Sequence, residues 1–178
     1  MLIDDVMPDC DFVESHARQS SLDVDAAWQS VLDLDLAKSR VVRALFFARG
    51  LGAWRRQGNA GSITFDDIVK WGFIDLGTNS AEEKLLGLIG EFWKPRGEIR
   101  RDVEAVDFAS FAEPGYVKAA WNFTVAPLDG GTMVATETRV QVTDAASLPK
   151  FRRYWRVMQP FSGVVRRQAL KIICHPRR

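Results

Sequence analysis

The chain has 178 residues, of which 47% are hydrophobic and 26% charged, with 13 glycines and 7 prolines. These fractions are typical of a globular protein and exclude a disordered, collagen-like or coiled-coil chain. Because the length suits one domain and no repeat or linker divides it, we expect a single domain over residues 1–178. No apolar run approaches the ~18 residues of a membrane span, so no integral membrane segment is expected.

Cysteine usage and the N-terminus both bear on location. Cys10 and Cys174 are far apart in the sequence, which predicts neither a disulfide framework nor a zinc site. The first residues, MLIDDVMPDCDFVE, are acidic and lack the basic-then-apolar order of a secretory signal. We therefore expect a reducing, cytoplasmic location.

Charge is unevenly distributed although the net charge is only +1. Residues 150–178 hold nine basic side chains and no acidic one, while the rest of the chain holds 15 basic and 23 acidic residues, a net charge of −8. Such asymmetry indicates either an anionic partner or a basic helix packed against an acidic body. We favour the second interpretation.

The first third of the chain predicts a strand followed by two short helices. Residues 11–20 alternate as in a strand with one wet face, with Val13, Ser15 and Ala17 opposed to Glu14, His16 and Arg18. That parity points His16 outward. A helix over 24–34, capped by Asp23, places Ala27, Trp28, Val31 and Leu32 on one face. A second helix over 39–48 is ended by Gly50 and Gly52.

The middle of the chain is dominated by strand signals. After a loop at 58–61, Thr64 can cap a helical turn over 64–70. Strands are predicted over 72–78 and 83–93, and the glycines at 87 and 90 indicate sharp curvature. A weaker strand over 98–103 and a short helical turn over 106–112 follow.

A hairpin is the strongest local signal. Segments 116–126 and 132–142 flank Asp129-Gly130, a favoured two-residue hairpin turn. With that turn, Trp121 lies opposite Thr138 and Phe123 opposite Thr136, on the same side as the pair Val125 and Val134. The other side carries Lys118, Asn122, Glu137, Arg139 and Gln141. We expect Glu137 and Arg139 to form a surface ion pair.

A long amphipathic helix is predicted at the C-terminus, with Asp144 as its cap. The apolar residues Phe151, Tyr154, Trp155, Met158, Phe161, Val165, Ala169 and Ile172 recur at helical spacing. The basic residues Arg152, Arg153, Arg156, Arg166, Arg167 and Lys171 fall in an arc on the opposite side. Pro160 predicts a kink or a break.

This order of elements predicts an α+β fold in which a curved antiparallel sheet wraps around the long C-terminal helix, with two short helices after the first strand. It resembles the helix-grip fold of the SRPBCC superfamily, which includes START-like, birch-pollen-allergen-like and polyketide-cyclase-like domains. The resemblance lies in the strand at 13–19, the helix at 26–28, TETRV at 136–140 and RRYWRVMQPFSGVVRR at 152–167. Bacterial members of that superfamily carry a similar YW…P…S…R run.

The resemblance implies a cavity between sheet and helix that holds an apolar ligand such as a lipid, sterol or polyketide. The residues predicted to line it are Trp121, Phe123, Thr136, Thr138, Tyr154, Trp155 and Met158. An apolar wall with a few hydroxyl groups suits a small-molecule site. The alternative is that the same side chains only fill the core.

Sequence motifs offer little support for catalysis. The chain lacks a nucleophile elbow, a phosphate-binding loop and a dinucleotide fingerprint, and His16 and His175 lie at opposite ends. Asp33 and Asp35 are placed as in an ordinary loop, so no metal or cofactor is expected. A cyclase- or dehydratase-type enzyme acting in the same cavity remains an alternative, as does an interaction module that uses the basic helix face. Nucleic acid is not expected as a partner, because no exposed aromatic residues are interleaved with these charges.

Overall fold

The structure, a computed structural model, describes residues 1–48, 61–79, 82–94 and 96–176. In chain order the helices and strands are α1 (Leu2–Val6), β1 (Phe12–Ser20), α2 (Val24–Leu32), η1 (Leu36–Lys38), α3 (Arg40–Ala48), α4 (Phe65–Lys70), β2 (Ile74–Asn79), β3 (Glu83–Gly90), η3 (Ala105–Asp107), β4 (Val117–Leu128), β5 (Gly131–Val142) and α5 (Leu148–Cys174). The expected glycine stop of α3 at Gly50 and Gly52 and most of the 58–61 loop lie outside the described residues.

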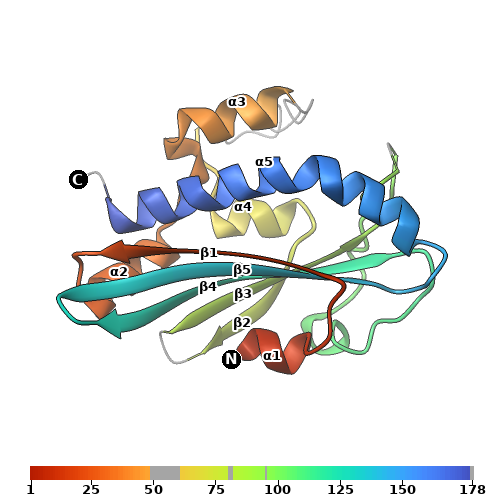
Figure 1. Cartoon of the computed structure of the whole chain (residues 1–178), viewed down its shortest axis with the longest axis horizontal. Helices are drawn as coiled ribbons and strands as arrows, with labels where there is room; N and C mark the ends of the chain where they lie inside the picture. The colour runs from red at the N-terminus through yellow and green to blue at the C-terminus, as the bar shows by residue number, and fades with distance from the viewer. Residues whose placement is uncertain (49–60, 80–81, 95, 177–178) are drawn as a thin grey trace.

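One curved antiparallel sheet, with the strand order β1-β5-β4-β3-β2, carries the other elements. Figure 1 shows α5 running along one face of this sheet, with α3 and α4 on the same side and α1 on the opposite side. The predicted α+β helix-grip arrangement is therefore confirmed, and so are the two short helices that follow the first strand.

The predicted hairpin is confirmed in both turn and register. Asp129 and Gly130 separate β4 from β5, and Trp121 pairs with Thr138 while Phe123 pairs with Thr136. Gly130 has a φ of +81°, a left-handed conformation that glycine adopts without steric cost. The turn therefore sets which hairpin side chains face α5.

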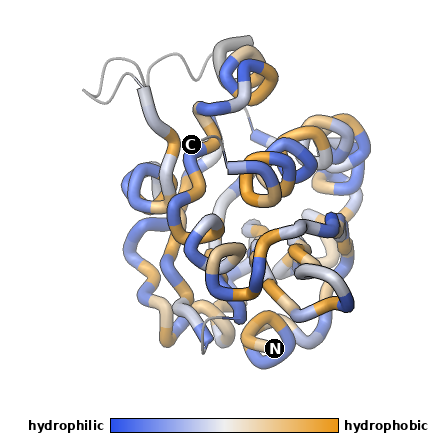
Figure 2. Tube along the Cα trace, turned by 90° about the vertical axis from the view of Figure 1, so that its left-hand side faces the viewer, coloured by the Kyte–Doolittle hydropathy of each residue, from blue (hydrophilic) through white to orange (hydrophobic). Residues whose placement is uncertain are grey.

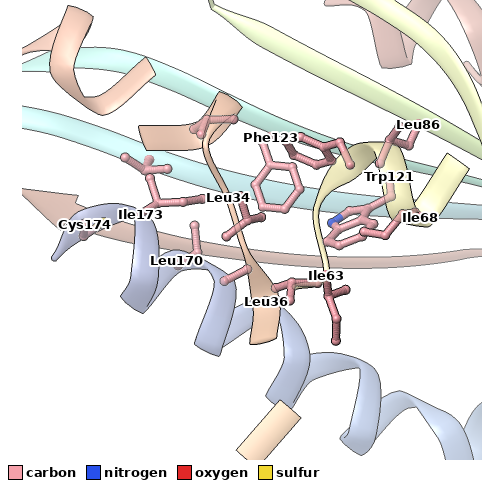
Figure 3. Close-up of a cluster of buried hydrophobic side chains, with 14 of the residues drawn as sticks. Leu34, Leu36, Ile63, Ile68, Leu86, Trp121, Phe123, Leu170, Ile173 and Cys174 are labelled. Atoms are coloured by element: carbon pink, nitrogen blue, oxygen red, sulfur yellow. The ribbon is translucent and has the colours of Figure 1, made fainter. Parts of the chain in front are cut away.

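The main core fills the space between the sheet and the C-terminal half of α5. In Figure 3, Trp121 and Phe123 of the sheet and Leu170 and Ile173 of α5 point toward one another, with Leu34 among them. Helices α2 and α4 add further apolar side chains to this cluster. Strand and helix periodicity predicts Trp121, Phe123 and Ala169 in this core, whereas Leu34, Leu170 and Ile173 are not among the residues that it predicts to pack.

The opposite face of the sheet is covered by α1 and the segment that contains η3. Ile3 and Met7 pack there against Leu85, Ile89 and Phe108. A side chain at Gly87 would come within 2.7 Å of the Phe108 ring, so the glycine allows this segment to lie directly on β3. Both faces of the sheet are therefore covered.

A buried carboxylate joins α1 to the sheet. Glu83, only 2% exposed, accepts hydrogen bonds from the backbone N–H of Leu2 at 2.6 Å and Ile3 at 3.3 Å. The Asn122 amide donates a third, at 2.7 Å. These contacts satisfy orphan N–H groups of the first helical turn from a distant strand.

The expected surface ion pair of Glu137 and Arg139 is instead covered by α1. Arg139 donates to Glu137 at 2.6 Å, to the carbonyl of Met7 at 2.9 Å and to Asp4 at 2.7 Å. Its side chain is 16% exposed. The sequence showed that these two residues share a face, but the N-terminal helix that covers this face carries no periodic signal long enough to reveal its position.

The predicted parity of β1 is wrong. Val13 is 51% exposed, and Ser15 and Ala17 are exposed too, whereas Glu14 and His16 lie on the face that meets α5. Pairing with β5 explains the reversal, because Glu14 lies opposite Thr138 and His16 opposite Thr136. As β1 is an edge strand, Val13, Ser15 and Ala17 can face solvent while Glu14 and His16 reach under the helix.

Other boundaries also differ from the expectations. Helix α5 begins at Leu148 after Ser147, and Asp144 instead accepts the N–H groups of Ser147 and Gly115. The helix continues through Pro160 without a break. Residues 98–103 form only an isolated bridge between Gly90 and Ile99 rather than a strand. Leu32 and Phe161, predicted to pack, are 41% and 46% exposed.

Hydropathy along the chain agrees with this layered packing. Figure 2 shows hydrophobic and hydrophilic residues alternating along the trace rather than collecting in one segment. Within the described residues, no helix has the length and apolar character needed to cross a bilayer.

Replacing Glu83 tests the link between α1 and the sheet. Glu83→Ala should lower the free energy of unfolding by about 2–3 kcal/mol, because the Asn122 amide and two backbone N–H groups lose their acceptor. Urea denaturation measures this change, and the exposed neighbour Glu82→Ala is the matched control. Equal stabilities of the two variants would contradict this role for Glu83.

Candidate ligand-binding site

The packing between the sheet and α5 is divided by a layer of polar side chains. Apolar residues gather in two clusters, one around Trp121, Ala169 and Ile173 and the other around Phe151 and Val140. Between them, α5 presents Ser162 and Arg166 to the sheet. We call the set Glu14, Thr138, Ser162 and Arg166 the polar layer.

Arg166 is the central residue of the polar layer and is only 8% exposed. Its Nε donates to Thr138 Oγ1 at 2.8 Å, Nη2 donates to the same hydroxyl, and Nη1 donates to Ser162 Oγ. The guanidinium carbon lies 5.3 Å from the centroid of the Trp121 ring, a cation–π contact. The side chain is therefore sandwiched between helix and sheet.

The sequence had placed Arg166 on the solvent side of α5, and this prediction is wrong. At 3.6 residues per turn, Arg166 lies at one margin of the basic arc, next to the stripe that includes Ala169 and Ile173. The other arginines of that arc, Arg152, Arg153, Arg156 and Arg167, are exposed, as is Lys171. The position of the sheet decides which margin of the arc is buried.

Burial changes the acid–base properties of Arg166. Desolvation lowers its pKa to about 10, opposed by the negative charge of Glu14. The guanidinium therefore remains protonated at neutral pH. Within the described part of the chain, no carboxylate oxygen lies within 4 Å of it, and its hydrogen-bond partners are neutral hydroxyl groups.

Glu14 links the polar layer to His16. Its Oε2 accepts a hydrogen bond from Ser162 Oγ at 2.8 Å, and its Oε1 accepts one from His16 Nε2 at 3.0 Å. Because a carboxylate only accepts, this bond requires the proton on Nε2 of the imidazole. Ser162 thus bridges the charges of Glu14 and Arg166.

Gly163 allows α5 to approach β1 this closely. A Cβ at this position would lie 2.6 Å from Glu14 Oε1 and 3.3 Å from His16 Nε2. Any side chain would push Glu14 away or lift the helix from the strand. The glycine therefore brings Ser162 within hydrogen-bond distance of Glu14.

Two grooves flank α5. The polar groove, about 480 Å³ in volume, runs between α5 and the edge strand β1, and it is lined by Val13, Glu14, Ser15, His16, Arg156, Gln159, Pro160, Gly163 and Arg167. The apolar groove, about 490 Å³, lies on the other flank and is lined by Trp93, Lys150, Arg153, Tyr154, Val157 and Met158. Each groove opens to solvent.

The predicted site residues are distributed over these features. Trp121 and Phe123 are packed in the main core, and Trp121 Nε1 donates to Thr136 Oγ1 at 2.7 Å. Thr138 belongs to the polar layer, while Tyr154 and Met158 line the apolar groove. Trp155 stacks on Phe151, with ring centroids 5.9 Å apart, and also contacts Phe12.

The predicted site omitted Glu14, His16, Ser162 and Arg166. One sequence signal was available for the strand residues. Phe12, the large apolar residue of β1, shares the parity of Glu14 and His16, and it packs under α5 beside Phe151. On the helix, the pattern places Arg166 only at a margin of the basic arc. Packing of α5 against the sheet decides that this margin is buried.

The arrangement offers charge and hydrogen bonding rather than metal coordination. Among the described residues, no group of three or more histidine, cysteine, aspartate or glutamate side chains is placed to hold a metal ion. Asp35 instead accepts the backbone N–H groups of Ala37 and Ile63.

No protein-family model matches the chain, and no curated protein is significantly similar to it.

Replacing Ser162 tests whether it bridges Glu14 and Arg166. Ser162→Ala should lower the free energy of unfolding by about 1–3 kcal/mol, because a buried guanidinium and a carboxylate each lose a partner. Ser15→Ala on the exposed face of β1 is the matched control in the same urea titration. In a Glu14→Gln background the cost should shrink, and an unchanged cost would show that the two residues are not coupled.

Proposed function

We propose that the protein binds a hydrophobic small molecule between the sheet and α5. The observation that carries the proposal is the interruption of apolar packing beneath α5 by the polar layer, with a solvent-open groove on each flank of the helix. A site with apolar walls and a few fixed polar groups suits a small molecule better than a continuous core would. Membership of the SRPBCC superfamily is part of this proposal, and the helix-grip architecture supports it.

The apolar part of the ligand has suitable contact surfaces in the apolar groove. Trp93, Tyr154 and Met158 offer aromatic and thioether surface there, and the neighbouring Val157 is 64% exposed. Methionine adapts to irregular apolar shapes because its side chain is flexible and polarisable.

Both cysteines are free, which supports a reducing, cytoplasmic location.

Binding of the neutral dye Nile red tests the proposal. Wild-type protein should raise its fluorescence saturably, and Met158→Ala should weaken its affinity roughly fivefold, because about 1 kcal/mol of apolar contact is lost. Trp155→Ala should also weaken binding, and circular dichroism checks that each variant is folded. Val106→Ala, at an 82% exposed position, is the control. Absence of saturable binding by the folded wild type would refute the proposal.

A second candidate function is acid–base catalysis in the polar groove. The specific observation is the His16–Glu14 hydrogen bond at 3.0 Å, because a carboxylate that orients an imidazole is a common arrangement for a general base. Such a base would take a proton from a substrate carbon and return one from solvent.

Deuterium incorporation distinguishes this enzyme from a binding protein. A small-molecule extract incubated in deuterium oxide with wild-type protein would gain label in a specific compound, and His16→Gln would abolish the gain. Mass spectrometry measures the label. Equal labelling with both proteins would exclude His16 as the base.

A further inference from the structure

We propose that Arg166 recognises a carboxylate group on the ligand, so that the protein selects amphipathic organic acids over neutral molecules of the same shape. The inference rests on the proposed function and names the class of molecule bound. The guanidinium of Arg166 is 8% exposed and has no carboxylate of the described residues in direct contact. Its hydrogen-bond partners are the hydroxyl groups of Thr138 and Ser162.

The guanidinium of Arg166 has N–H donors left for an additional hydrogen-bond partner. A guanidinium has five N–H donors, and three of its contacts go to Thr138 and Ser162. One N–H on each terminal nitrogen is therefore left without an acceptor among the described residues. Two donors in a planar fork match the geometry of a carboxylate, which forms the stronger, charge-assisted bond.

Two other largely covered cations, Arg139 and Lys84, are paired with carboxylates, whereas the buried Lys118 donates to the carbonyl of Ala109. Arg139 meets the carboxylates of Glu137 and Asp4, and Lys84 meets Asp75 at 2.6 Å. A buried charge without a direct counter-ion costs desolvation energy that hydroxyl groups repay only in part. A carboxylate on the ligand would offset more of this desolvation energy. Part of the binding free energy would then come from relieving a cost that is already present in the free protein.

The polar groove provides an approach with a favourable potential. Arg156 and Arg167 line it, and neither has an ion-pair partner among the described residues. Glu14 lies between this groove and Arg166, with one oxygen on His16 and the other on Ser162. The two exposed arginines thus attract an anion to this groove, and Glu14, which lines the groove whereas Arg166 does not, is the opposing charge that the anion meets.

A matched ligand pair tests the recognition of the acid group. Decanoate and decanol have the same chain length but differ in charge, and isothermal titration calorimetry gives both affinities. Wild-type protein should bind decanoate at least tenfold more tightly than decanol. Arg166→Met should remove this preference and leave the affinity for decanol within about twofold of wild type. Arg152→Met, which removes an exposed arginine of the same helix outside both grooves, should retain the preference.

Two further variants distinguish recognition from a purely structural role. Glu14→Gln removes the opposing charge but keeps an acceptor for Ser162, so it should tighten decanoate binding severalfold without affecting decanol. Arg166→Lys keeps the charge but not the planar fork, and it should show an intermediate preference. It also serves as the test if Arg166→Met does not fold.

The outcomes separate this inference from the proposed function. Equal affinity of wild-type protein for acid and alcohol would overturn the carboxylate proposal and leave hydrophobic binding intact. A preference that survives in both Arg166 variants would assign acid recognition to Arg156 and Arg167 and would also overturn it. Failure to bind either compound would refute both proposals.

Discussion

The close contact between α5 and the edge strand β1 is the constraint on which the rest of the site depends. A curved sheet has a concave face that must be covered, and α5 is the element long enough to cover it. At Gly163 the helix has no side chain to hold it away from Glu14. Ser162 and Arg166 therefore reach strand residues instead of solvent, and a polar layer forms where a larger residue would have kept helix and strand apart.

That polar layer has an energetic cost that Arg139 and Glu83 avoid. Arg139 is neutralised by two carboxylates, and Glu83 is satisfied by three N–H groups. Lys118 also lacks a carboxylate partner and donates to the carbonyl of Ala109, and burial lowers its pKa. A lysine can relieve such burial by losing its proton, whereas an arginine stays charged near neutral pH. Arg166 therefore holds a permanent charge between two apolar clusters.

The two grooves follow from the same geometry. A helix that lies across a sheet covers only its own width, so a groove is left along each flank. The side chains of α5 make one groove polar and the other apolar. One flank presents Arg156, Gln159 and Arg167, while the other presents Tyr154, Val157 and Met158. The helix therefore has charged side chains along one groove and apolar surface along the other.

Local chemistry in the sequence was sufficient to predict most of the architecture. The Asp129-Gly130 turn determines the register of β4 and β5 and so the inward direction of Trp121 and Phe123, and Asp23 caps α2 as expected. These signals are short-range, since each depends on residues adjacent in the chain or one hairpin apart. The sequence by itself therefore determined the α+β class, the hairpin and the amphipathic C-terminal helix.

The tertiary structure alone decided where the charges lie. The inward parity of Glu14 and His16 depends on the pairing of β1 with β5, more than a hundred residues away, and the burial of Arg166 depends on which margin of a basic arc meets the sheet. An edge strand tolerates either parity, and a helix with a broad polar face tolerates several rotations. Periodicity cannot choose among them, because the choice is made by long-range contacts such as the fit of α5 to β1 at Gly163.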